Sequence, residues 1–186
     1  MGANTINYNE EVLKGGLLIS GVSILITMLT YIINDGRLDS GFWLSLLTII
    51  INIGVVVYVG ISFRNAIGGF MTYKETLKFL TLTLLVAYLV GTIFNMLLYN
   101  VIDPDLPEKM KAYSIETTEA ISLWFGAPPE AIDAGIAEIQ EQDFEEQFSP
   151  MGLIKSAPLG VLGIFIFSLI VSIFVKKEEP FSDRIN

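Results

Sequence analysis

The sequence contains neither cysteine nor histidine. Without cysteine the chain can form no disulfide and offers no thiolate, and without histidine it has no imidazole metal ligand and no histidine-based catalytic triad. The Asp, Glu, Ser and Lys residues that remain show no recognisable spacing of a nucleophile and its base. We therefore predict that the protein is not an enzyme, with no catalytic residue and no cofactor.

Positive charge is also scarce. Eleven Lys and Arg residues stand against twenty Asp and Glu residues, giving a net charge of −9. Nucleic-acid binding depends on basic residues that neutralise phosphates, so nucleic acid is excluded as a partner. The acids of the segment 138–146 could in principle ligate Ca²⁺, but their spacing is not that of an EF-hand, and acidic runs usually form a solvated face. No metal site is predicted.

Long apolar stretches are what the sequence has in abundance. The chain is 52% hydrophobic, with a mean hydropathy of +0.60. Crossing a bilayer as a helix takes roughly 20 apolar residues, and the backbone of such a segment must satisfy its own hydrogen bonds. The composition therefore predicts an all-α integral membrane protein, a four-helix bundle in a lipid bilayer. The predicted spans are 13–33, 42–62 and 77–102 within residues 1–102, and 153–175 within residues 151–186.

The fourth span contains an internal proline. Proline is tolerated in the first turn of a helix but disturbs a helix interior. We therefore predict that this helix starts near Met151 and is irregular at Lys155–Pro158.

The spans carry no charged residue at mid-membrane depth, although Asn52 and Asn95 lie within them. Proton relays and ion-coupled transporters commonly use charged residues there. An asparagine inside a span usually makes a hydrogen bond between helices. The two asparagines predict either such interhelical bonds or the lining of a polar path.

Small residues also recur at four-residue spacing, which allows two helix backbones to approach closely. These pairs predict helix packing inside the monomer or, alternatively, a homo-oligomer that forms through one of the faces. The residues are Gly16 and Ser20, Ala87 and Gly91, and Ser156 and Gly160.

The basic residues give the chain a direction across the membrane. Placing both termini in the cytoplasm puts seven of them inside and four outside, as the positive-inside rule prefers. The outer side then carries a net charge of −10 and the inner side +1. The seven are Lys14, Arg64, Lys74, Lys78, Lys176, Lys177 and Arg184, and the four are Arg37, Lys109, Lys111 and Lys155.

Residues 103–150 differ from the rest in carrying twelve acids and only two basic residues. Asp105 is a candidate N-cap, and helical spacing then continues to Gly126, just before Pro128-Pro129. A second helix is predicted to end at Ser149-Pro150. The segment is therefore expected to form an extramembrane lobe, an acidic helical hairpin between the third and fourth spans.

The loop between the second and third spans has local signals of its own. Gly68-Gly69 permits a tight turn with positive φ, and Thr72 followed by Glu75 matches a capping box. We predict a turn and a helix cap at the membrane surface.

Three short segments resemble a membrane protein family of Bacteroidota known as domain of unknown function 4199. They are Gly68–Lys78, Ile102–Leu106 and Phe148–Met151, and the similarity extends over about residues 10–178. The chain departs from the family's pattern at Pro128-Pro129, where a more continuous helix is expected. The resemblance implies a Gram-negative inner membrane with the outer side in the periplasm, and it implies no activity, ligand or functional residue.

Two functions remain open. The first is a non-enzymatic scaffold or accessory subunit that engages a protein partner through the acidic periplasmic hairpin. The second is a small oligomeric transporter or channel whose acidic mouth attracts cations, with Asn52 and Asn95 along its path.

Overall fold

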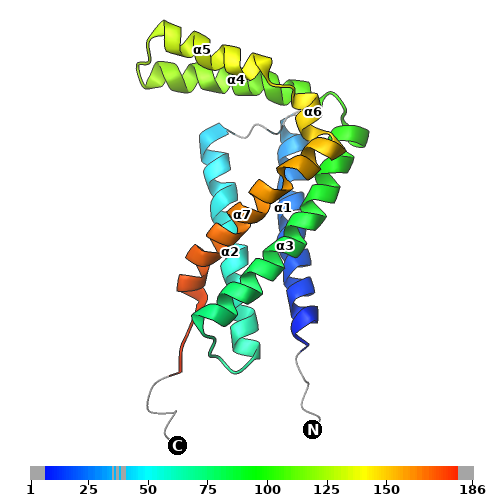
Figure 1. Ribbon diagram of the computed structural model, residues 1–186, viewed down its shortest axis with the longest axis vertical. Coiled ribbons are helices and arrows are strands. Elements are labelled where there is room, and N and C mark those ends of the chain that lie inside the picture. Colours follow the sequence, from blue (N-terminus) through cyan, green and yellow to red (C-terminus); the bar gives the residue numbers. More distant parts are fainter. Residues whose placement is uncertain (1–6, 35, 37, 39–40, 180–186) are drawn as a thin grey trace, which may run out of the picture. The chain divides into compact units, whose positions relative to one another are not determined.

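The computed structural model describes residues 7–34, 36, 38 and 41–179, which fold into helices joined by short connections (Figure 1). Arg37 and Arg184, two of the basic residues used to orient the chain, lie outside the described residues. The chain divides into two compact units. The first consists of residues 1–26, 42–91 and 157–186, and the second of residues 27–41 and 92–156.

Among the residues that the structure describes, four helices are long and apolar enough to cross a membrane, as predicted. The chain is therefore a multi-pass membrane protein with an all-helical architecture. A π-helix, η1 (Leu98–Ile102), continues α3 directly. The four helices are α1 (Tyr8–Ile33), α2 (Gly41–Ala66), α3 (Tyr73–Leu97) and α7 (Pro150–Val175).

The helices α1 and α3 begin about one turn before the apolar stretches from which they were predicted. The first turn of α1 carries Glu10 and Glu11, and that of α3 carries Glu75. Acidic residues are favourable at a helix N-terminus because they lie at the positive end of its dipole. A polar first turn can therefore extend a helix beyond the hydrocarbon, and apolar runs alone do not reveal it.

The predicted irregularity in the fourth span is wrong. The helix α7 begins at Pro150 and is helical through Lys155–Pro158, so Pro158 lies inside it. The Ser149 hydroxyl accepts a hydrogen bond from the Gly152 backbone N–H at 3.1 Å and thereby caps the helix. Because Ser149 supplies a cap and Pro150 suits a first helical position, the start is set before Met151.

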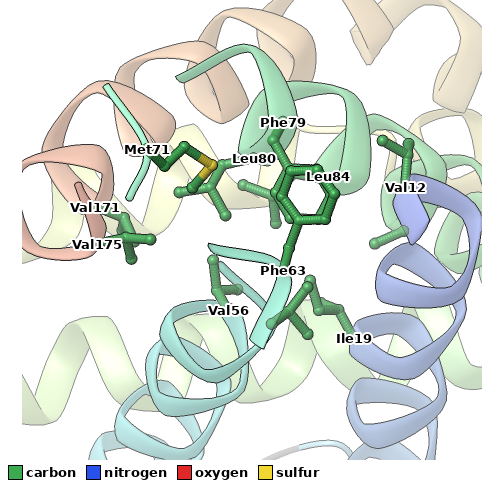
Figure 2. Packing of buried hydrophobic residues seen from close by; sticks show 12 residues of the cluster. Val12, Ile19, Val56, Phe63, Met71, Phe79, Leu80, Leu84, Val171 and Val175 are labelled. Atoms are coloured by element: carbon green, nitrogen blue, oxygen red, sulfur yellow. The ribbon is translucent and has the colours of Figure 1, made fainter. Parts of the chain in front are cut away.

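The core of the first unit is built from all four membrane helices (Figure 2). The rings of Phe63 on α2 and Phe79 on α3 stack with centroids 4.0 Å apart. Tyr8 of α1 packs edge-on against both rings. Val175, the last residue of α7, is fully buried in the same cluster. This core holds one end of each helix in place.

The second unit contains the predicted hairpin. Helix α4 (Leu106–Trp124) lies beside α5 (Pro129–Glu141) and also contacts the short helix α6 (Phe144–Phe148) (Figure 1). Gly126 has φ +71° and follows the end of α4, and its N–H donates to the Leu123 carbonyl. The predicted stop at Gly126 is therefore confirmed. Asp105 occupies the N-cap position, but its side chain makes no cap hydrogen bond.

The second helix of the hairpin ends earlier than predicted. It stops at Glu141, and α6 starts after an extended Gln142 and Asp143. The Asp143 carboxylate accepts a hydrogen bond from the Glu146 N–H at 2.8 Å, which caps a new helix. A cap inside an acidic run is hard to recognise, because each neighbouring acid fits a helix surface equally well.

Candidate functional site

The loop between α2 and α3 forms the predicted turn and cap. Gly68 and Gly69 both have positive φ, at +114° and +88°, a conformation that side chains with a Cβ rarely adopt. The Glu75 carboxylate accepts from the Thr72 backbone N–H and from its hydroxyl, both at 2.8 Å. The backbone N–H of Glu75 lies 3.4 Å from the Thr72 hydroxyl oxygen. This reciprocal capping box fixes the first turn of α3.

The same loop is bound to the end of α7. Met71 and Lys177 exchange two backbone hydrogen bonds of 2.8 and 3.0 Å as an isolated antiparallel bridge. The Arg64 guanidinium donates at 2.6 Å to the carbonyl of Val175, the last residue of α7. A cation at a helix C-terminus also complements the negative end of the helix dipole. These bonds hold the C-terminus of α7 against the loop between α2 and α3.

Asn52 lies beside α1 within the first unit. Its side-chain oxygen accepts from the Ser23 hydroxyl at 2.5 Å, and its amide group donates to the Thr48 carbonyl at 2.9 Å. The side chain thus joins α2 to α1, as expected of an asparagine in a span. Asn95 belongs to the second unit, so a path that combines Asn52 and Asn95 stays a prediction.

The small residues of α1 and α3 pack closely within the first unit. Gly16 lies so near α3 that an added Cβ would stand 2.9 Å from the Thr83 carbonyl oxygen. Ser20 and Ala87 are buried, whereas Gly91 faces open space. The close approach at Gly16 is therefore a contact between α1 and α3 within one chain.

The third small-residue pair is divided between the units. Gly160 in the first unit lies against the Tyr88 ring, where an added Cβ would be 2.8 Å from the hydroxyl oxygen. Ser156 belongs to the second unit, and its hydroxyl donates to the Leu153 carbonyl in its own helix. The role predicted for this pair as one contact face stays a prediction.

A polar network in the second unit ties three segments together. The Asp103 carboxylate, 9% exposed, accepts from Lys109 Nζ at 2.6 Å and from the Tyr31 hydroxyl at 3.0 Å. The hydrogen bond from Lys109 and then that from Tyr31 lower the pKa of Asp103, against the opposing effect of partial burial. The same bond raises the pKa of Lys109. The network anchors the start of α4 to the ends of α1 and η1.

We expect the variant Asp103→Asn to lose stability in a pH-dependent way. The Lys109 side chain is 39% exposed, so solvent screens the pair and the loss at neutral pH should be about 1 kcal/mol. Because the folded pKa of Asp103 lies below its ordinary value of 3.8, the stabilisation is complete above that value and disappears as pH falls through the folded pKa. The free energy of unfolding of both proteins in detergent micelles, measured against pH, checks this.

Lys109→Met serves as the matched control, because it removes the other partner. Its contribution should be complete below pH 10.5 and disappear as pH rises through the raised pKa of Lys109. A difference between wild type and Asp103→Asn that persists unchanged at strongly acidic pH would rule out this ion pair as the cause.

The α4–α5–α6 segment presents a strongly acidic surface. Its two basic side chains are used internally, Lys109 on Asp103 and Lys111 on the carbonyls of Gln140 and Gln142. No group of three acids lies close enough to hold a metal ion in the part of the chain that the structure describes. Ten carboxylates of the segment are exposed: Glu108, Glu116, Glu119, Glu130, Asp133, Glu138, Glu141, Asp143, Glu145 and Glu146.

An apolar tip lies where α4 ends in the acidic hairpin. Trp124 and Phe125 are 81% and 74% exposed, and their rings contact each other edge-to-face with centroids 4.8 Å apart. Ile121 and Leu123 are also exposed. Large exposed apolar groups that cluster together mark interaction sites more often than isolated ones do. No site residue was predicted at this tip from the sequence.

One comparison with known proteins gives a match. A family model described as "Protein of unknown function (DUF4199)" matches residues 14–177, which is most of the chain. The chain belongs to this family. No curated protein and no solved structure matches it. The family match includes all three segments on which the resemblance was based, and the family's description names no activity, so a function must be inferred from the geometry above.

Proposed function

We propose that this member of the DUF4199 family is a non-enzymatic membrane protein, a scaffold or accessory subunit whose acidic hairpin holds a protein partner. The observation that supports this most directly is the combination of ten exposed carboxylates with an exposed aromatic tip at Trp124 and Phe125. Interfaces are enriched in aromatic anchors surrounded by polar groups. The charge favours a partner with a basic surface.

In this proposal both termini lie in the cytoplasm and the hairpin projects into the periplasm from the inner membrane. The support is the distribution of basic residues, seven on the inner side and four on the outer. A reporter enzyme that is active only in the periplasm, fused after Asn186, should be inactive. An active reporter would show the opposite orientation, with the hairpin in the cytoplasm.

The partner is tested by photocrosslinking of the full chain in its native membranes. A photoreactive phenylalanine analogue replaces Phe125, and the same analogue at Phe174, equally exposed on the apolar helix α7, serves as the matched control. We expect a protein adduct from position 125 and none of the same mass from position 174. The captured protein, identified by mass spectrometry, should present a basic surface.

The charge requirement is tested by Glu116→Gln, Glu119→Gln and Glu130→Gln combined. All three carboxylates are exposed, so the fold should tolerate the change. Adduct formation at position 125 should fall at least several-fold, and it should fall similarly at high salt, where charges are screened within about 3 Å. An adduct that is insensitive to both changes, or no adduct at all, would refute the proposal.

A further inference from the structure

A cavity of about 500 Å³ lies between the four helices of the first unit. Its wall includes Ile19 of α1, Val56 of α2, Ala87 of α3 and Phe167 of α7, each close to the middle of its span. The volume falls within the range of about 300–1,000 Å³ typical of sites for small ligands. The lining is mainly apolar.

The polar side chains on the wall are largely engaged with the protein itself. Ser23 donates to Asn52, Asn52 donates to a backbone carbonyl, and Ser20 donates to the Leu17 carbonyl. A buried water needs two to four polar partners, which an apolar wall does not offer across most of this space. Water is therefore a poor occupant.

An empty cavity is also unfavourable, because the atoms on its wall lose their dispersion contacts. The space is open to the surface of the first unit, so its occupant can enter from the surroundings. A helix from a second copy, about 10 Å across with its side chains, is too thick for most of a space of this volume. A slender, flexible and apolar molecule fits best. At the middle of four membrane spans, that molecule is the hydrocarbon chain of a lipid.

We propose that this cavity, the mid-span cavity, binds the acyl chain of a membrane lipid. The chain lies against Ile19, Ala87 and Phe167, and the Ser23–Asn52 pair marks its polar edge. This site is separate from the hairpin that holds the partner, so either proposal can fail without the other.

The test uses the full chain reconstituted in vesicles of phosphatidylethanolamine and phosphatidylglycerol. A small fraction of phosphatidylcholine carries a diazirine in its acyl chain, and irradiation followed by mass spectrometry locates the adducts. Val56 and Leu84 line the cavity and are buried, whereas Leu80 is fully buried outside it and Ile170 is exposed. We expect Val56 and Leu84 to be labelled about fivefold more than Leu80, because a packed interior excludes the probe. Labelling of Val56 and Leu84 at the level of Leu80 would overturn the proposal.

Two glycine variants make the test specific. Gly91 lines the cavity and an added Cβ there meets no atom within 4 Å, so Gly91→Leu should fill the space. Gly163 on α7 has equally free surroundings outside the cavity, so Gly163→Leu is the matched control. Gly91→Leu should lower the labelling of Val56 and Leu84 about fivefold and leave Ile170 unchanged. Unchanged labelling in Gly91→Leu would overturn the proposal, and if that variant fails to fold, the comparison with Leu80 in the wild type still decides.

Discussion

Replacing Phe79 with alanine is expected to cost about 3 kcal/mol of unfolding free energy, the lower end of the range of about 3–5 kcal/mol for such core substitutions. Phe79 is 1% exposed, stacks on Phe63 and contacts Tyr8 edge-on. In a bilayer the lipid is as apolar as the core, so the loss arises from broken packing and not from transfer to water. Unfolding by sodium dodecyl sulfate in mixed micelles, followed by circular dichroism, measures it.

Leu89→Ala is the control for this prediction, because Leu89 lies on the same helix but is 61% exposed. Its removal leaves the core intact and should change stability by less than about 0.5 kcal/mol. Equal losses in the two variants would show that the aromatic cluster of Phe63 and Phe79 does not hold the first unit together.

Sequence alone predicts those features of this fold that depend on local composition. The four spans follow from runs of about 20 apolar residues, because the backbone of such a run satisfies its hydrogen bonds in hydrocarbon by forming a helix. The stop of α4 follows from Gly126 and the prolines after it, and the capping box follows from Thr72 and Glu75. In each case residues within a few positions of one another determine the structure.

The contacts between distant segments were not predicted. Arg64 reaches the carbonyl of Val175, and Met71 pairs with Lys177, across more than a hundred residues of chain. In the sequence, Asp103 is one of twelve acids in residues 103–150. In the structure, its carboxylate accepts hydrogen bonds from Tyr31 and Lys109. A sequence shows that such residues can bond, but only the packing of the helices determines which of them meet.

The two candidate sites differ in how far the sequence reveals them. The acidity of the hairpin is a matter of composition and was evident from the sequence, whereas the mid-span cavity depends on the gaps that four packed helices leave between their side chains. Asn52 was a candidate from the start, and the structure shows that it bonds to Ser23 of a neighbouring helix.

Leucine in place of Gly16 is expected to cost about 3 kcal/mol or more, at or above the upper end for overpacking substitutions. An added Cβ at Gly16 would lie 2.6 Å from the Val86 Cβ and 2.9 Å from the Thr83 carbonyl oxygen. The Val86 Cβ and the Thr83 carbonyl belong to the framework of α3, so no side-chain rotation relieves the clash and the two helices must separate. The free energy of unfolding in mixed micelles measures the effect.

Gly54→Leu is the matched control, since an added Cβ at Gly54 meets no atom within 4 Å. It should leave stability unchanged or raise it slightly, because glycine costs a helix about 0.5–1 kcal/mol relative to alanine. The pair of variants also separates the two interpretations of the small-residue face. If Gly16→Leu leaves the monomer as stable as Gly54→Leu does but abolishes a dimer detected by chemical crosslinking, the face around Gly16 joins two copies of the chain. A loss of stability in the monomer itself, with no dimer involved, assigns the face to the contact between α1 and α3.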